Sequence, residues 1–378
     1  MNKKAGKVMP VIYPGQTIGI IGNDQRAYML ALKAKEMGYR VAAIVTPQIQ
    51  NTAFTSLIDC QIDGELNDYQ KLSQLGEVSQ VLTYTNELLD EALLEQLAQQ
   101  YYLPQGSNVL SVTQDRYLEK VFLNDLNINI PPFATIVDVD DIYQAIESIG
   151  YPCILKPIQK GYGKQYQRFI QQPSDLEKDA ASLKLGTYIL ESWIPDAQEL
   201  SVMVVKCKTG QIVTLPVIEN EFDDHRLKMS LVPARINQDV ATEINRLAHL
   251  IGDKLDYIGV FGVEFFLTPD MNIYVKRIIP TPHATGDVLS HTLNFSQYEY
   301  HLKVICQLAV GPARLNSAGM MLGVQERQRS LIQTQMKIKP DWYFNLHTVT
   351  ADQQIGLVTA TGQTIQPLIA NFEAADLY

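Results

Sequence analysis

The first hundred residues alternate between apolar strand patterns and amphipathic helix patterns, and this alternation limits the folds open to the chain. Residues 17–22 form a short apolar strand pattern, a helix with alanine and leucine on one face follows, and 40–46 form a second strand. Residues 78–84 supply another strand and 87–101 another helix. Alternation of this kind favours a parallel sheet covered by helices. We therefore expect an α/β first domain over residues 1–105.

The remainder of the chain is less regular and predicts a mixed helix and strand structure. For a chain of 378 residues, two or three domains are expected. The segment 311–378 predicts short strands and turns. Helices are expected at 113–126, 139–149, 174–184 and 239–255, and strands at 153–156, 201–206, 211–218, 257–267 and 273–279.

Charge and cysteine content argue against several classes of function. The chain has 41 acidic and 31 basic side chains, a net charge of −10, and only 19% charged residues. Such a chain is a poor candidate for binding nucleic acid or anionic membranes. Its longest apolar stretch, residues 257–267, is too short to cross a bilayer. The four cysteines lie far apart without metal-ligand spacing, which indicates reduced thiols and a cytoplasmic protein.

Two glycines at the end of the first strand invite comparison with dinucleotide-binding loops. The segment from Gly19 to Gly22 lacks the Gly-x-Gly-x-x-Gly spacing. The second strand ends at Thr46-Pro47 without an acidic residue for a ribose hydroxyl. Since the glycines can also serve a tight turn, a nicotinamide-dependent dehydrogenase is not favoured.

Lysines and a glycine-containing loop follow the strand at 153–156 and suggest an anion site. Lys156 ends that strand, and the loop 160–166 contains Lys160 and Lys164. Backbone N–H groups of such a loop can approach a phosphate that the lysine also contacts. The alternative, which spacing alone favours, is a solvated lysine at a strand end.

Three glutamates are candidates for a functional role. Glu264 lies inside the apolar strand 260–267, where a carboxylate needs a cation, a metal or hydrogen-bond donors. Its simplest partner is Arg277 on the neighbouring strand. Glu191 and Glu199 precede the predicted hairpin and could bind a nucleotide's ribose or amino group, although each alone is more typical of a surface residue.

Taken in order, these segments resemble one family, the N5-carboxyaminoimidazole ribonucleotide synthetases, which are ATP-grasp ligases of purine biosynthesis. The resemblance implies a Rossmann-like N-terminal domain over 1–105, an ATP-grasp domain over 106–310 with a small lid over 153–192, and a small β-rich domain over 311–378. No single segment is specific for this family, but the occurrence of all of them in the same order along the chain is. The matching segments are 14–22, 35–39, 83–84, 114–120, 150–152, 155–156, 199–201, 219–220, 233–235, 263–266 and 282–283.

The resemblance also implies a reaction and roles for individual residues. Members of the family use ATP and Mg²⁺ to activate bicarbonate as carboxyphosphate, which then carboxylates the amine of aminoimidazole ribonucleotide. A cytoplasmic homodimer acting on small molecules is implied. By position, the implied roles are ATP-phosphate contacts for Arg116, Lys156 and Lys164, adenine and ribose contacts for Glu191, Trp193, Ile194 and Glu199, a metal ligand in Glu264, and catalytic roles for Lys156, Arg277 and His283.

The chain departs from the family pattern where the chemistry is concentrated. The family has a second metal carboxylate where this chain has Arg277, which implies a weakened or absent Mg²⁺ site. The phosphate-covering loop is one residue shorter and has Gln165 in place of a glycine. Three hypotheses stay open, because fold alone does not fix function. They are a ligase of this family with an altered site, a non-catalytic nucleotide-binding paralogue with a regulatory or partner role, and an ATP-grasp ligase for another acceptor.

Overall fold

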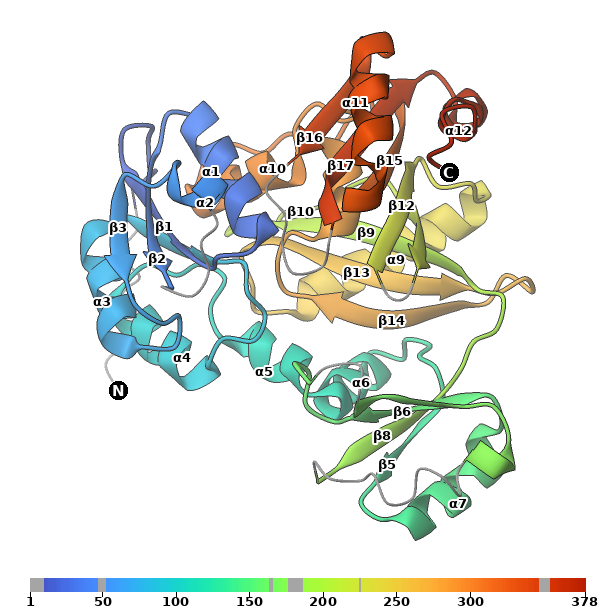
Figure 1. Ribbon diagram of the computed structural model, residues 1–378. Helices are drawn as coiled ribbons and strands as arrows, with labels where there is room; N and C mark the ends of the chain where they lie inside the picture. The colour runs from blue at the N-terminus through green and yellow to red at the C-terminus, as the bar shows by residue number, and fades with distance from the viewer. Residues whose placement is uncertain (1–9, 47–51, 163–165, 176–185, 224–225, 347–353) are drawn as a thin grey trace.

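The strands of the protein form three sheets in the computed structural model, which describes residues 10–46, 52–162, 166–175, 186–223, 226–346 and 354–378. A four-stranded sheet belongs to the N-terminal part (blue in Figure 1), a nine-stranded sheet occupies the middle, and a smaller four-stranded sheet lies apart from both. The mixed α/β and α+β class expected from the sequence is confirmed. Within the described ranges, no helix is long and apolar enough to cross a membrane.

The N-terminal part is built from alternating strands and helices. Its elements are β1 (Thr17–Ile21), α1 (Gln25–Glu36), β2 (Arg40–Val45), α2 (Thr52–Thr55), β3 (Cys60–Asp63), α3 (Tyr69–Val78), β4 (Val81–Tyr84) and α4 (Glu91–Gln100). The strands are parallel in the order β3-β2-β1-β4, which confirms the predicted β-α-β unit. A Cβ atom on Gly19 would lie 2.5 Å from Leu82 Cδ2, so this glycine serves close packing between β1 and β4.

Two helices, α5 (Asn108–Gln114) and α6 (Arg116–Asp125), replace the single helix predicted at 113–126. The break falls at Asp115, whose backbone is extended and whose Oδ1 accepts from the N–H groups of Tyr117 and Leu118 at 2.8 and 3.0 Å. An aspartate that caps a new helix competes with continuation of the old one. The correction has a functional consequence, because it puts Arg116 and Glu119 in the first turn of α6.

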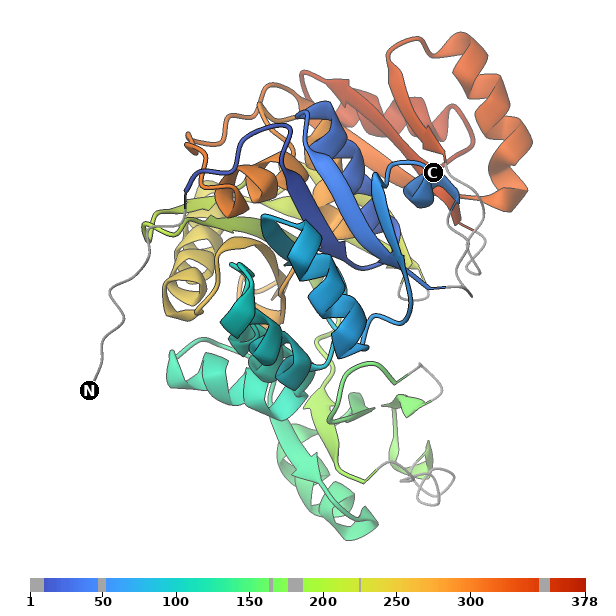
Figure 2. The same cartoon turned by 90° about the vertical axis from the view of Figure 1, so that its left-hand side faces the viewer.

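The small sheet contains β5 (Phe133–Ile136), β6 (Cys153–Pro157), β7 (Arg168–Ile170) and β8 (Tyr188–Ser192), with α7 (Val139–Ile149) packed against it. Its antiparallel order is β5-β8-β6-β7. It therefore begins at β5, earlier than the predicted lid at 153–192, because β5 pairs along β8. Figure 2 shows this sheet and α7 projecting from the body of the molecule. Most of the helix predicted at 174–184 lies outside the described residues.

The large sheet runs from the middle of the chain into the C-terminal region. Its strands are β9 (Gln198–Lys206), β10 (Ile212–Thr214), β11 (Ile218–Asp223), β12 (Arg226–Val232), β13 (Gly259–Leu267), β14 (Ile273–Ile279), β15 (Ala318–Gln325), β16 (Trp342–Leu346) and β17 (Gln354–Gly362). They are ordered β14-β13-β9-β11-β12-β15-β17-β16, with β10 beside β9. The strand predicted at 211–218 is thus divided into β10 and β11, and both pair with β9. Its helices are α9 (Gln238–Lys254), α10 (Gln297–Ile305) and two 3₁₀ segments (Ala284–Ser290 and Glu326–Gln328).

The C-terminal region contains two helices that the sequence prediction of strands and turns missed. These are α11 (Arg329–Ile338) and α12 (Ile365–Glu373). Ile365, Leu368 and Phe372 form the buried face of α12, and the Phe372 ring lies 4.2 Å from that of Trp342 on β16. The C-terminal strands continue the large sheet, because β15 pairs antiparallel with β12.

His301 on α10 joins the N-terminal sheet to the large sheet. Its Nδ1 accepts from the Val260 N–H at 3.0 Å, so Nε2 carries the proton and donates to Thr83 Oγ1 at 2.8 Å. The Thr83 hydroxyl in turn donates to Gln105 Oε1 at 2.6 Å. Burial lowers the pKa of His301 to about 3, which keeps the ring neutral as this series of hydrogen bonds requires.

We expect His301→Leu to lower the free energy of unfolding by about 2–4 kcal/mol, because buried partners on β13 and β4 lose their hydrogen bonds. Urea denaturation measures the loss. His249→Leu, at an exposed position of α9, is the control and should change stability by less than about 0.5 kcal/mol. Wild-type stability should also fall as pH drops from 6.5 towards 3, since the unfolded histidine binds a proton that the folded one does not. Equal losses in both variants would contradict the prediction.

Candidate active site

Glu264 on β13 and Arg277 on β14 form a bidentate ion pair on the large sheet. The residues are paired in register, with Arg277 Nε donating to Glu264 Oε2 at 2.7 Å and Nη2 donating to Oε1 at 3.0 Å. Burial opposes ionisation of Glu264, but the charges of Arg277 and Lys276 hold its pKa well below the usual range. The partner that the sequence suggested for Glu264 is confirmed.

A β-bulge brings Lys276 to the same carboxylate. Successive side chains of a regular strand point to opposite faces, so Lys276 and Arg277 would normally diverge. Here the register shifts between Glu264 and Phe265, which pairs with Val275 and leaves Lys276 without an opposite residue. Lys276 Nζ lies 3.3 Å from Glu264 Oε2 and donates to Glu199 Oε2 on β9 at 2.6 Å. Both cations of β14 therefore face one site.

Glu191 on β8 is a buried carboxylate shared by two lysines. Lys120 of α6 donates to its Oε1 at 2.9 Å, and Lys156 of β6 donates to its Oε2 at 2.8 Å. Although burial opposes ionisation, these lysines lower the pKa of Glu191 to about 2. The surface position expected for Glu191 when taken alone is wrong, because the charge is matched from two other elements.

The first turn of α6 contributes a second set of charges. Glu119 Oε1 accepts from the Ile278 N–H at 2.8 Å, and its Oε2 pairs with Lys160 Nζ at 2.9 Å. Arg116 lies on the same turn, and its buried Nη1 atom has no hydrogen-bond partner among the described residues. Burial, together with the nearby Arg277, lowers the pKa of Arg116. An arginine nitrogen in this state is suited to receive an anionic ligand.

A third group of side chains comes from the N-terminal part and from the segment after β14. Arg26 of α1 donates through Nε to Asp24 at 2.7 Å and through Nη1 to Thr281 Oγ1 at 3.1 Å. Glu87 is partly buried, and Arg277 and Arg26 keep its pKa below the usual value although desolvation opposes ionisation. His283 has Nδ1 at 3.9 Å from Glu264 Oε1, and burial lowers its pKa to about 4. The ring of His283 is thus neutral at pH 7.

The structure brings together most of the site residues predicted from the sequence. Arg116, Lys156, Glu191, Glu199, Glu264, Arg277 and His283 all belong to the connected groups above. Trp193 and Ile194 stand directly after β8, and the Trp193 ring packs edge-to-face on Phe169 at 4.8 Å. Lys164 lies outside the described residues.

Four residues at this site were not assigned a role from the sequence: Arg26, Glu87, Glu119 and Lys120. Glu119 and Lys120 belong to the segment 114–120 that matched the family, so their position gave a usable signal. Arg26 and Glu87 follow β1 and β4, where the carboxyl ends of parallel strands present loops to a ligand. That rule could have identified them.

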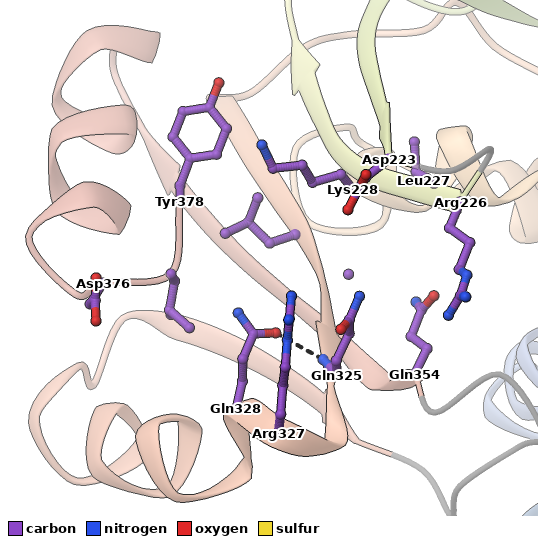
Figure 3. A pocket seen from close by; sticks show the side chains of 13 residues that line it. Asp223, Arg226, Leu227, Lys228, Gln325, Arg327, Gln328, Gln354, Asp376 and Tyr378 are labelled. Carbon is purple, nitrogen blue, oxygen red and sulfur yellow. Dashed lines mark hydrogen bonds between the residues drawn. The ribbon is translucent and has the colours of Figure 1, made fainter.

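A separate pocket of about 270 Å³ lies beside β12, β15 and the last residues of the chain (Figure 3). It has both signs of charge, with Asp223 and Asp376 near Arg226, Lys228 and Arg327. None of the predicted site residues lines it. The charged cluster between the sheets is therefore the better candidate for an active site.

A divalent metal ion does not fit the arrangement around Glu264. Mg²⁺ takes oxygen ligands, yet both oxygens of this carboxylate already accept N–H groups of Arg277. In the described part of the chain, no group of three or more His, Cys, Asp or Glu side chains could hold a metal. At an effective dielectric near 20, a dication about 4 Å from the guanidinium would be repelled by roughly 8 kcal/mol. The assignment of Glu264 as a metal ligand is therefore not supported.

Comparisons with known proteins agree over most of the chain. A ribonucleotide synthetase preATP-grasp domain matches residues 15–114, and an ATP-grasp domain matches residues 121–298. The N5-carboxyaminoimidazole ribonucleotide synthase of Bacillus subtilis (strain 168) is 33% identical over 92% of each chain. That of Staphylococcus saprophyticus is 30% identical over 95% of this chain and 97% of the other.

Solved structures give the same result. An ADP complex of N5-carboxyaminoimidazole ribonucleotide synthetase has a TM-score of 0.92 at 29% identity and covers 98% of both chains. The Staphylococcus aureus N5-carboxyaminoimidazole synthetase complexed with ADP has a TM-score of 0.90 at 27% identity, covering 97% of this chain and 98% of that one. Fold and site thus define an ATP-grasp enzyme. More particularly, the chain belongs to the N5-carboxyaminoimidazole ribonucleotide synthase family.

We expect Glu191→Gln to lower the free energy of unfolding by about 3–5 kcal/mol, because Lys120 and Lys156 lose their shared counter-charge inside the protein. Glu243→Gln breaks an exposed pair with Arg246 and should cost less than about 1 kcal/mol. Denaturation at neutral pH measures both. In the wild type the Glu191 contribution is complete above pH 4.5 and is lost as pH falls towards about 2. If Glu191→Gln left the free energy of unfolding unchanged, the structural role of Glu191 would be refuted.

Proposed function

We propose that the chain uses ATP and bicarbonate to carboxylate the amine of 5-aminoimidazole ribonucleotide, forming N5-carboxyaminoimidazole ribonucleotide in purine biosynthesis. The observation that carries the proposal is the meeting of Arg116 on α6, Lys156 on β6 and Arg277 on β14 around one set of buried carboxylates. Cations from three elements suit a polyphosphate and its transfer chemistry. Relatives of matching length that have this name support the choice of substrate.

The nucleotide phosphates contact Arg116 and Lys156 in this proposal. Arg116 offers its unpartnered Nη1, and Lys156 is held in place through Glu191 with its side chain 24% exposed. Since both oxygens of Glu191 are engaged by lysines, we assign it to positioning these cations rather than to adenine. Trp193 and Ile194 retain the adenine role and Glu199 the ribose role that the family resemblance implies. A phosphate role for Lys164 stays a prediction.

The reaction has two steps. A bicarbonate oxygen attacks the terminal phosphorus of ATP, the bond to the ADP oxygen breaks, and carboxyphosphate forms. The amine nitrogen then attacks the carboxyl carbon, inorganic phosphate leaves with the bonding electrons, and the nitrogen loses a proton. Lys156 and Arg277 stabilise the negative charge that spreads over the transferred group, and His283 keeps the catalytic role that the family resemblance implies.

The acceptor ribonucleotide is assigned to the N-terminal side of the site. Arg26, fixed by Asp24 and Thr281, is suited to a sugar phosphate. Glu87, kept ionised by the surrounding cations, is suited to the amino group of the imidazole. Arg26 lies in the first turn of α1 and Glu87 in the turn after β4, whereas the residues assigned to ATP lie on elements further along the chain. The amine and the activated carboxyl group would therefore meet between these parts.

A second candidate function is nucleotide binding without turnover. The specific observation in its favour is the Arg277–Glu264 pair, which occupies both oxygens of the carboxylate that the family resemblance assigns to metal. A regulatory or partner role would then follow. An ATP-grasp ligase for another acceptor is the remaining alternative, and it differs from the first proposal only at Arg26, Glu87 and His283.

Two further properties belong to the proposal. All four cysteines are free thiols, which supports a reducing, cytoplasmic location. The homodimer expected from the family resemblance stays a prediction that light scattering can test.

The deciding experiment is ADP release by the purified chain with ATP, bicarbonate, aminoimidazole ribonucleotide and MgCl₂, with the product identified by mass spectrometry. We expect acceptor-dependent turnover in the ordinary enzymatic range of about 1–10³ s⁻¹. Lys156→Met should lower kcat/KM by about 10²-fold or more, because a phosphate contact is lost in the transition state. Lys254→Met, at an exposed position of α9, should leave it unchanged. If the wild-type chain released no ADP, the proposal would be overturned in favour of nucleotide binding without turnover. Turnover with other amines would favour a ligase for another acceptor.

A further inference from the structure

Two consecutive cations on β14, Lys276 and Arg277, pair with Glu264, the carboxylate to which the family resemblance assigns a metal. We propose that Arg277 and Lys276 perform the charge-neutralising role of that metal ion, so that this chain binds the phosphates of its nucleotide without Mg²⁺. The inference rests on the nucleotide binding contained in the proposed function and concerns the same site.

The two cations are open to a ligand while the carboxylate behind them is covered. The exposed fraction of the side chain is 3% for Glu264, 35% for Arg277 and 27% for Lys276. The Glu199 side chain beside Lys276 is 30% exposed, so a ligand that approaches this part of the sheet meets two cations and one carboxylate. Such a surface attracts polyphosphate oxygens and repels a dication.

Arg277 retains hydrogen-bond donors after it has paired with Glu264. A guanidinium presents five N–H groups in a planar fork. Glu264 takes only the Nε–H and one Nη2–H of that fork. The pairing fixes the plane of the guanidinium, and a fixed fork matches two phosphate oxygens at once. Glu264 therefore acts as a positioning residue for Arg277.

Each carboxylate in this part of the site has a basic partner without a metal. Glu264 and Glu199 oppose Arg277 and Lys276, and Glu119 pairs with Lys160 at 2.9 Å. Glu191 is matched by two lysines. No surplus of negative charge remains among these described groups to hold Mg²⁺, whereas Arg116 adds an unpartnered nitrogen for phosphate.

The bulge between Glu264 and Phe265 makes the arrangement specific. It turns both Lys276 and Arg277 towards one side of β14, although they are adjacent in sequence. A regular strand would present only one of them to a ligand. The bulge thus lets two side chains together present the two positive charges that one divalent metal ion would have.

The test measures ADP binding to the full chain by isothermal titration calorimetry, once in excess EDTA and once in excess MgCl₂. We expect the two dissociation constants to agree within about threefold. Arg277→Glu should weaken ADP binding in EDTA by about tenfold or more, and MgCl₂ should restore it, because the second carboxylate now favours a dication. Arg246→Glu makes the same charge change on an exposed position of α9 and should alter neither constant.

A second variant keeps the test independent of the folding of Arg277→Glu. Lys276→Gln leaves the Arg277–Glu264 pair intact and should weaken ADP binding by about threefold or more in both buffers. Thermal melting of each variant verifies that it is folded.

Each result has a definite meaning. Wild-type binding that strengthens tenfold or more with MgCl₂ would overturn the inference and leave the proposed reaction standing. Unchanged affinity of Arg277→Glu in EDTA would overturn it as well. Absence of ADP binding in both buffers would refute the inference together with the proposed function. Metal-independent ADP binding without acceptor-dependent turnover would support the inference and refute the proposed reaction.

Discussion

The ion pair of Glu191 with two lysines determines how the small sheet meets the rest of the molecule. Glu191 belongs to β8, Lys156 to β6 and Lys120 to α6, so one buried carboxylate joins two strands to a helix. A buried charge is tolerated only when its partners are present. All three charges are matched only when α6 packs against the small sheet. The same contact with Glu191 fixes the position of the Lys156 ammonium group. The position of this proposed phosphate-binding group therefore follows from the need to neutralise a buried carboxylate.

Local patterns explain which parts of the fold could be predicted. The β1-α1-β2 unit depends on apolar periodicity within a short segment, and it was predicted correctly. The break at Asp115 was missed because the apolar face of the predicted helix continues across it, while the deciding interaction is a side-chain cap. The helix α12 was missed because its apolar face has only three buried residues, and its packing partner Trp342 comes from another strand.

Sequence separation explains which parts of the site could be predicted. Glu264 and Arg277 lie 13 residues apart on neighbouring strands, so the partner could be named in advance. Glu191 meets Lys120 across 71 residues and Lys156 across 35, and nothing local in its segment shows that it is buried. The contact between Arg26 and Thr281 spans 255 residues. Nothing local in either segment could suggest such a contact.

The antiparallel pairing of β12 with β15 has a consequence for the integrity of the chain. This pairing satisfies the backbone groups of Met229–Val232 along one side of β12. A proteolytic cut before Ala318 would remove β15 and expose that row of N–H and C=O groups, together with apolar side chains such as Leu231. An open strand edge of this kind is a template for pairing with another molecule. Loss of the C-terminal region would therefore threaten solubility before it touched any residue of the site.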